Sequence, residues 1–218
     1  MEVYFMNGSR KIKASSKLSI RGKHNSTKMY RMIPWESTLE RDFIKLLDFD
    51  PTVVYFEFQP LRIDYLYKGK QKKYYPDFLV QKSNSKRYIY EVKAFEQTKE
   101  EINKIKFQVG KMYSRNKGMD YIVITEKDIR KGFLIENIDL LTEVRYETTS
   151  KRVMTEIVNK LDDLEGRTTK ANLRGNLSHI SKREFDCNLY YLIYTHQIKT
   201  DLISVLLNEH SIILGCDC

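Results

Sequence analysis

The chain has 218 residues, of which 41% are hydrophobic, 12% aromatic and 31% charged. This composition can bury one large core, or a core and a small second domain, and it excludes a disordered chain. The apolar runs are too short to span a bilayer and the first residues do not resemble a signal peptide, so we expect a soluble, cytoplasmic protein without membrane contact.

The net charge is +9, and most of it lies near the N-terminus. Residues 1–35 contain a single acid and eight basic side chains, namely Arg10, Lys11, Lys13, Lys17, Arg21, Lys23, Lys28 and Arg31. Lys and Arg release counterions when they neutralise a nucleic-acid backbone, so we interpret residues 1–35 as a basic arm that binds DNA. The alternative is a tail that only increases solubility.

Residues 36–48 follow a helix start signal, carry apolar side chains at helical spacing, and are predicted to form a helix. A strand rich in β-branched and aromatic residues is predicted at 53–58. Turn signals at 68–70 and 83–85 then divide the following stretch into three extended segments, 61–67, 73–80 and 87–93. These segments predict a mainly antiparallel sheet.

Residues 97–115 have the apolar spacing of a second helix, and residues 120–125 form a short apolar run typical of a buried strand. Because a helix connects this strand to the sheet, we expect the strand to lie parallel to one already present. The order of elements predicts an α/β core with a mixed sheet flanked by helices, over residues 36–147.

The composition becomes polar around residues 145–150, and we place a domain boundary between 147 and 148. Further helices are predicted near 153–161 and 185–194, followed by two strand-like runs within 198–214. Helices followed by a hairpin favour a small winged-helix-like domain at 148–218, with any other small α+β domain as the alternative.

A possible hydrolytic site follows from Pro76-Asp77 and Glu91-Val92-Lys93. If the two extended segments pair as a hairpin, their ends meet, and alternation along the strand sends Glu91 and Lys93 to the same face. Magnesium is held by one or two carboxylates together with water and substrate phosphate, which suits Asp77 and Glu91. Lys93 would orient the attacking water and offset the charge that develops on the phosphate.

Glu40 is the fourth candidate, because a carboxylate beside the apolar stripe of the first helix can reach over the sheet. Glu36, one turn earlier, is the less favoured ligand. The competing interpretation is that the pattern arises by chance and that Glu91 and Lys93 form an ordinary charge pair on an edge strand.

The sequence resembles the TnsA endonuclease subunit of heteromeric cut-and-paste transposases, within the PD-(D/E)xK nuclease superfamily. The resemblance covers roughly residues 35–145 and rests on a series of blocks: Ser37-Thr38-Leu39-Glu40-Arg41-Asp42-Phe43, Phe49-Asp50-Pro51, Phe58-Gln59-Pro60-Leu61, Tyr75-Pro76-Asp77-Phe78-Leu79-Val80, Glu91-Val92-Lys93 and Tyr121-Ile122-Val123-Ile124-Thr125-Glu126-Lys127-Asp128-Ile129. It places the family's helix glutamate on Glu40, its metal aspartate on Asp77, and its strand pair on Glu91 and Lys93. Some members carry Gln at the position of Glu91, so the ligand here is either this side chain or the backbone carbonyl of Val92.

The resemblance implies a restriction-endonuclease-like core and a Mg²⁺-dependent DNA endonuclease, with Mn²⁺ as an alternative ion. It implies nicking of the strand that ends 5′ at each transposon end, while an integrase-like transposase cuts the other strand. It further implies a C-terminal winged-helix-like domain that contacts an AAA+ ATPase regulator. Two rival functions are a stand-alone restriction or junction-cleaving nuclease and a non-catalytic DNA-binding adaptor.

Overall fold

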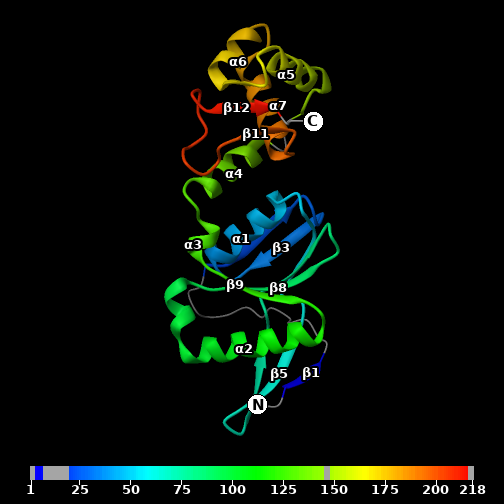
Figure 1. Ribbon diagram of the computed structural model, residues 1–218, viewed down its shortest axis with the longest axis vertical. Helices are drawn as coiled ribbons and strands as arrows, with labels where there is room; N and C mark the ends of the chain where they lie inside the picture. Colours follow the sequence, from blue (N-terminus) through cyan, green and yellow to red (C-terminus); the bar gives the residue numbers. More distant parts are fainter. Residues whose placement is uncertain (1–2, 7–19, 145–147, 216–218) are drawn as a thin grey trace. The chain divides into compact units, whose positions relative to one another are not determined.

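The computed structural model describes residues 3–6, 20–144 and 148–215 (Figure 1). The chain divides into two compact units, Met1–Ile129 and Arg130–Cys218. The division lies earlier than the boundary expected between 147 and 148. The reason is that helix α4 (Leu134–Glu143), which the sequence assigned to the first domain, packs against helix α7 (Lys182–Tyr194) of the second.

The first unit is built around a four-stranded mixed sheet with the order β4-β7-β8-β9. Its strands are β4 (Val53–Phe58), β7 (Phe78–Lys82), β8 (Arg87–Val92) and β9 (Asp120–Ile124). The pairs β4-β7 and β7-β8 are antiparallel, whereas β8 and β9 are parallel. The parallel pairing expected for the strand at 120–125 is therefore confirmed.

Helices α1 (Thr38–Phe49) and α2 (Glu101–Asn116) lie on opposite faces of this sheet (Figure 1). The ring of Phe43 in α1 lies 5.3 Å from that of Phe78 and 5.1 Å from that of Tyr90. On the other face, Val109 of α2 belongs to the same buried cluster as Ile89. A mixed sheet flanked by helices is consistent with the restriction-endonuclease-like core expected from the sequence.

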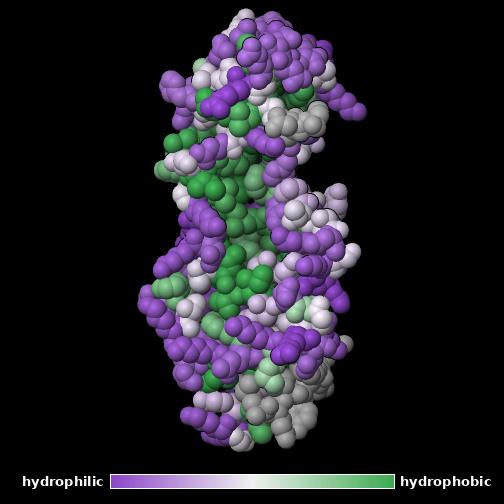
Figure 2. Space-filling view, in the orientation of Figure 1, coloured by the Kyte–Doolittle hydropathy of each residue, from purple (hydrophilic) through white to green (hydrophobic). Residues whose placement is uncertain are grey.

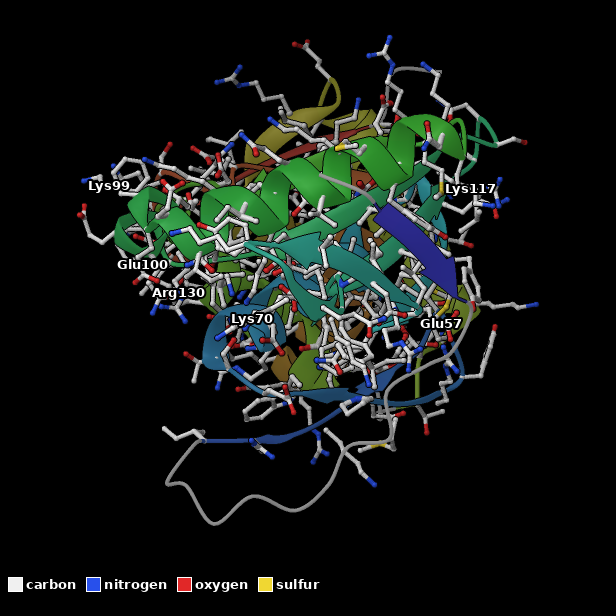
Figure 3. The ribbon with its side chains drawn as sticks, turned by 90° about the horizontal axis from the view of Figure 1, so that it is seen from below. Glu57, Lys70, Lys99, Glu100, Lys117 and Arg130 are labelled. Carbon is white, nitrogen blue, oxygen red and sulfur yellow. The ribbon has the colours of Figure 1, made fainter. Side chains whose placement is uncertain are left out.

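Short helical segments complete the connections in this unit. The 3-10 helix η1 (Phe95–Lys99) leads into α2, and α3 (Glu126–Ile129) follows β9. In Figure 3, the labels of Lys99, the last residue of η1, and Lys117, the residue after α2, lie on either side of α2.

One expectation about the sheet was wrong. Residues 73–80 do not form one extended segment but contribute to two strands in different sheets. Strand β6 (Lys70–Tyr74) pairs with β5 (Arg62–Tyr67), which also pairs with β1 (Val3–Met6), whereas β7 begins at Phe78. The break falls around Pro76, because proline cannot donate a ladder hydrogen bond and restricts the residue before it.

The N-terminal region also differs from the basic arm that we expected at 1–35. Its described part contains a hairpin of β2 (Gly22–Ser26) and β3 (Arg31–Trp35), which packs on α1. The carboxylate of Asp48, near the end of α1, bonds His24 at 2.7 Å and accepts a 2.6 Å hydrogen bond from Ser26. Side-chain contacts with α1 therefore fix this part of the chain. Arg10, Lys11, Lys13 and Lys17 lie outside the described residues.

The second unit combines helices with a small antiparallel sheet of order β10-β12-β11. Besides α4 and α7, its elements in chain order are α5 (Lys151–Asp163), β10 (Arg167–Thr169), α6 (Lys170–Asn176), β11 (Ile198–Thr200) and β12 (Ile212–Gly215). Both predicted helices are present. The strands within 198–214 are shorter than the sequence suggested, because residues 201–211 form a long connection. Hydrophilic side chains cover much of α5 and α6 in Figure 2.

Candidate active site

Asp77 lies in the short connection between β6 and β7, immediately before β7. It is 8% exposed, and its Oδ2 accepts a 2.8 Å hydrogen bond from the backbone N–H of Val92 at the end of β8. Its backbone carbonyl accepts a 2.7 Å hydrogen bond from the N–H of Gln59. Asp77 is thus tied to the ends of two neighbouring strands, as the hairpin pairing predicted.

Glu91 and Lys93 project together from the end of β8. The Lys93 ammonium lies 3.4 Å from Oε1 of Glu91, and Oε2 of Glu91 accepts a 2.6 Å hydrogen bond from the hydroxyl of Tyr74. Glu91 is only 2% exposed. β8 is not an edge strand, because β7 and β9 flank it on both sides. The interpretation of Glu91 and Lys93 as a charge pair on a sheet edge therefore does not apply.

Burial raises the pKa values of these acids, and repulsion between them adds to the effect at Asp77. Burial, followed by the charges of Glu91 and Glu40, raises the pKa of Asp77 well above its usual value. Burial also raises the pKa of Glu91, against the opposing effect of Lys93. Although burial acts in the other direction, Glu91 and Asp77 raise the pKa of Lys93 and keep it cationic. The three carboxyl groups of Asp77, Glu91 and Glu40 thus outnumber the cations that act on Glu91, which are Lys93 and Lys106.

Glu40 lies in the first turn of α1, and its carboxylate accepts hydrogen bonds at the N-terminus of that helix. Oε2 accepts a 2.7 Å hydrogen bond from the N–H of Glu36, and Oε1 accepts one of 3.1 Å from the hydroxyl of Ser37. Ser37 in turn accepts from the N–H of Glu40, so the group is a variant of the capping box. Burial raises the pKa of Glu40, and Glu40 acts electrostatically on both Asp77 and Lys93.

The carboxylate oxygens of the site are the kind of ligand that Mg²⁺ prefers, but the site is not a preformed cluster of three carboxylates. Within the described part of the chain, no group of three or more His, Cys, Asp or Glu side chains is gathered as a metal site. Magnesium needs only one or two carboxylates from the protein, however. Each carboxylate oxygen has a second lone pair beyond the hydrogen bond it accepts, so Asp77 and Glu91 keep the capacity to bind an ion.

Gln59 is a site residue that sequence reasoning missed. It adopts a left-handed backbone with φ of 44°, is 6% exposed, and donates from Nε2 to Glu36 at 3.3 Å. Its Oε1 is buried and accepts no hydrogen bond from the described residues. Strained backbone of this kind is concentrated at functional sites. In the sequence, Gln59 was marked only by its place in the block Phe58-Gln59-Pro60-Leu61 of the resemblance, which assigned it no role.

Residues 50–126 match the family model described as the TnsA-like endonuclease N-terminal domain. This segment contains Asp77, Glu91, Val92 and Lys93. The segment is therefore similar to TnsA-like endonuclease domains. No curated protein matches the chain.

The match extends from just after α1 to the start of α3, so the TnsA-like segment includes all four strands of the mixed sheet. Glu40 lies outside it, on the N-terminal side. The match supports a nuclease of TnsA type. Within the described ranges, no helix is long and apolar enough to cross a membrane.

The basic residues of the N-terminal region differ in their surroundings. Lys23 and Arg31 lie on the β2-β3 hairpin, and Arg21 lies 3.9 Å from the Glu36 carboxylate. Lys28 has a structural contact, since its ammonium donates to the backbone carbonyls of Leu47 and Asp50 at 2.8 and 2.5 Å. Its positive charge therefore has a structural role at the C-terminus of α1 that does not require DNA.

Proposed function

We propose that this chain is the metal-dependent endonuclease subunit of a transposase, and that it nicks the strand ending 5′ at each transposon end. The observation that carries the proposal is the convergence of Asp77, Glu91 and Lys93 within the segment that matches the TnsA-like family. An integrase-like transposase would cut the other strand and join the DNA.

In this proposal, Asp77 and either the Glu91 side chain or the Val92 carbonyl hold a Mg²⁺ ion, with Mn²⁺ as a substitute, and Glu40 assists from α1. The ion, when bound, neutralises charge on the phosphate and makes a bound water more acidic. Lys93 donates hydrogen bonds to the attacking water or to the phosphate oxygens and offsets the charge developing there. The hydrogen bond from Val92 to Asp77 fixes the carboxylate before DNA arrives.

The charge distribution supports DNA binding by the first unit. Residues 130–218 contain twelve Lys and Arg against thirteen Asp and Glu, so residues 1–129 carry a net charge of +10. Because phosphate binding scales with the number of cationic contacts, the positively charged unit is the one suited to DNA. Arg10, Lys11, Lys13, Lys17, Arg21, Lys23 and Arg31 are the proposed backbone contacts of the N-terminal region.

The second unit is proposed to be winged-helix-like and to contact an AAA+ ATPase regulator. Its elements run helix, strand, helix, helix and hairpin from α5 to β12, which is the order of such domains. Most of α7 is buried, so this helix presents few side chains for reading DNA. In the connection between β11 and β12, Ile203, Val205 and Leu206 are 46–49% exposed.

Hydrogen bonds from α4 hold the connection between β11 and β12 in place. Asn137 of α4 is fully buried; its Nδ2 donates to the carbonyls of Leu202 and Val205, and its Oδ1 accepts from the N–H of Leu207. A rigid loop with exposed apolar side chains on a nearly neutral domain suits a protein partner rather than DNA. Replacing Ile203 and Leu206 by Ser should abolish co-purification with the regulator and leave the fold intact.

The decisive experiment measures strand-specific nicking of transposon ends in the presence of the transposase and Mg²⁺. Asp77→Asn and Lys93→Ala should each abolish the 5′-strand nick while DNA binding persists. Matched controls are Asp120→Asn and Lys86→Ala. Both residues are exposed and lie where β9 and β8 begin, at the end of the sheet remote from the site. If both site variants nick normally, the assignment of Asp77 and Lys93 as catalytic residues is refuted. Nicking without any transposase would favour a stand-alone nuclease.

A further inference from the structure

Two tyrosines from separate parts of the fold form a hydrogen-bonded chain that ends on Glu91. The hydroxyl of Tyr74 in β6 donates to Oε2 of Glu91 at 2.6 Å, and the Tyr121 hydroxyl of β9 lies 2.8 Å from that of Tyr74. Tyr74 is only 3% exposed and Tyr121 packs against the same core. Glu91 therefore meets an ordered donor on the side away from Lys93.

The two donors together fix the plane of the Glu91 carboxylate. Tyr74 holds Oε2 and Lys93 holds Oε1, so rotation of the carboxylate would break both contacts. Tyr74 belongs to the sheet of β1, β5 and β6, whereas Glu91 belongs to the mixed sheet. The smaller sheet is thus joined to the proposed catalytic sheet through this hydrogen bond.

A glycine in the middle of α2 makes room for the Tyr121 side chain of this hydrogen-bonded pair. A Cβ atom at Gly110 would lie 2.1 Å from Cε2 and 2.7 Å from Cζ of the Tyr121 ring. Glycine inside a helix is less stable than alanine by roughly 0.5–1 kcal/mol, so its presence here has a compensating reason. The reason is that the Tyr121 ring passes against the helix and brings its hydroxyl to Tyr74.

We propose that Tyr74, supported by Tyr121 and Gly110, is a positioning residue that makes the Glu91 side chain a ligand of the divalent ion. The inference rests on the proposed function and extends it by choosing the Glu91 carboxylate over the Val92 carbonyl. Groups that hydrogen-bond to metal ligands fix ligand orientation, and their loss commonly reduces metal affinity by about 10–100-fold.

The test is Mn²⁺ binding to the full chain, measured by titration calorimetry without DNA. Tyr74→Phe should weaken Mn²⁺ affinity at least about tenfold, with an unchanged circular dichroism spectrum. The matched control is Tyr65→Phe, since Tyr65 is equally buried in the same cluster and makes no hydrogen bond to Glu91. Gly110→Ala should weaken binding in the same direction, even though alanine favours the helix.

A double-mutant cycle separates positioning from general damage to the fold. In a Glu91→Gln background, adding Tyr74→Phe should cause little further loss, because Tyr74 acts through the Glu91 carboxylate. Equal losses in both backgrounds would overturn the inference, and so would wild-type Mn²⁺ affinity in either Tyr74→Phe or Glu91→Gln.

Asp77→Asn distinguishes failure of this inference from failure of the proposed function. If Asp77→Asn binds Mn²⁺ like the wild type, the metal site itself is wrong, and the positioning role falls with it. If Asp77→Asn loses binding while Tyr74→Phe retains it, the nuclease proposal stands and the positioning role of Tyr74 fails. If Glu91→Gln also retains binding, the ligand is the Val92 carbonyl.

Discussion

The carboxylate of Glu40 accepts a 2.7 Å hydrogen bond from the backbone N–H of Glu36, so the acid proposed to assist metal binding also closes the N-terminus of its own helix. These two roles can be separated by substitution. Gln in this position retains an oxygen that can accept from the N–H, whereas Ala does not.

We predict that Glu40→Gln changes the free energy of unfolding by less than about 0.5 kcal/mol, and that Glu40→Ala lowers it by about 1 kcal/mol. Both variants should lose nicking activity, because neither keeps a carboxylate. Urea denaturation and the nicking assay measure the two effects. Full nicking by Glu40→Gln would restrict Glu40 to helix capping.

The buried acids predict an unusual pH dependence for the metal-free protein. The pKa of Asp77 is raised, mainly by burial, so its contribution to stability is fully present below the unfolded-state pKa and is lost as pH rises through the folded-state pKa. Asp77→Asn removes the charge and should stabilise the protein at pH 8 but not at pH 4. One pKa unit corresponds to about 1.4 kcal/mol. Thermal unfolding across this range in chelator tests the sign, and a stability difference that does not vary with pH would contradict it.

Basic residues of the N-terminal region should fall into two groups. Neutralising Lys11, Lys13 and Arg21 should weaken DNA binding uniformly across sequences and reduce the slope of log K against log salt by roughly 0.9 for each phosphate that is no longer neutralised. Lys28→Met should instead leave the slope unchanged and lower the free energy of unfolding by about 1 kcal/mol, because Lys28 binds carbonyls at the end of α1. A salt slope altered by Lys28→Met would return this lysine to the residues that bind DNA.

A buried lysine should be critical for the second unit. The ammonium of Lys170 lies 2.8 Å from Asp186 and 3.3 Å from Glu209, and it donates to the hydroxyl of Tyr190 at 3.1 Å. Lys170→Met leaves these partners without their cation and should cost about 3–5 kcal/mol. Lys160, which is partly exposed and paired with Asp163 on α5, is the matched control, and its replacement should cost less than about 1 kcal/mol. Similar melting temperatures for the two variants would contradict the prediction.

Local pattern was enough to predict the elements that carry the proposed site. Strand alternation predicted that Glu91 and Lys93 share a face, and the crossover helix predicted the parallel pairing of β8 and β9. Both features depend on short-range periodicity and on the handedness of connections. They therefore do not require knowledge of which distant residues meet.

Contacts between distant residues could not be predicted. Tyr74 and Tyr121 are 47 positions apart, and Tyr74 lies in a strand that we joined to the wrong neighbour. Lys28 looks like any other basic residue until the carbonyls of α1 are seen beside it. The spacing of Ser37 and Glu40 is typical of a capping box and could have predicted the capping role of Glu40, but we interpreted Glu40 only as a metal ligand.

The turn at residues 83–85 joins β7 to β8 at the end remote from Asp77 and Lys93. The five residues of β7 and the six of β8 separate it from the proposed chemistry by about 17–20 Å. Asn84 and Ser85 are exposed at its tip, so additional residues can be accommodated there without changing the register that aligns Glu91. This turn is therefore a place where a fluorophore or affinity tag can be attached to follow the protein while its proposed DNA substrate is bound.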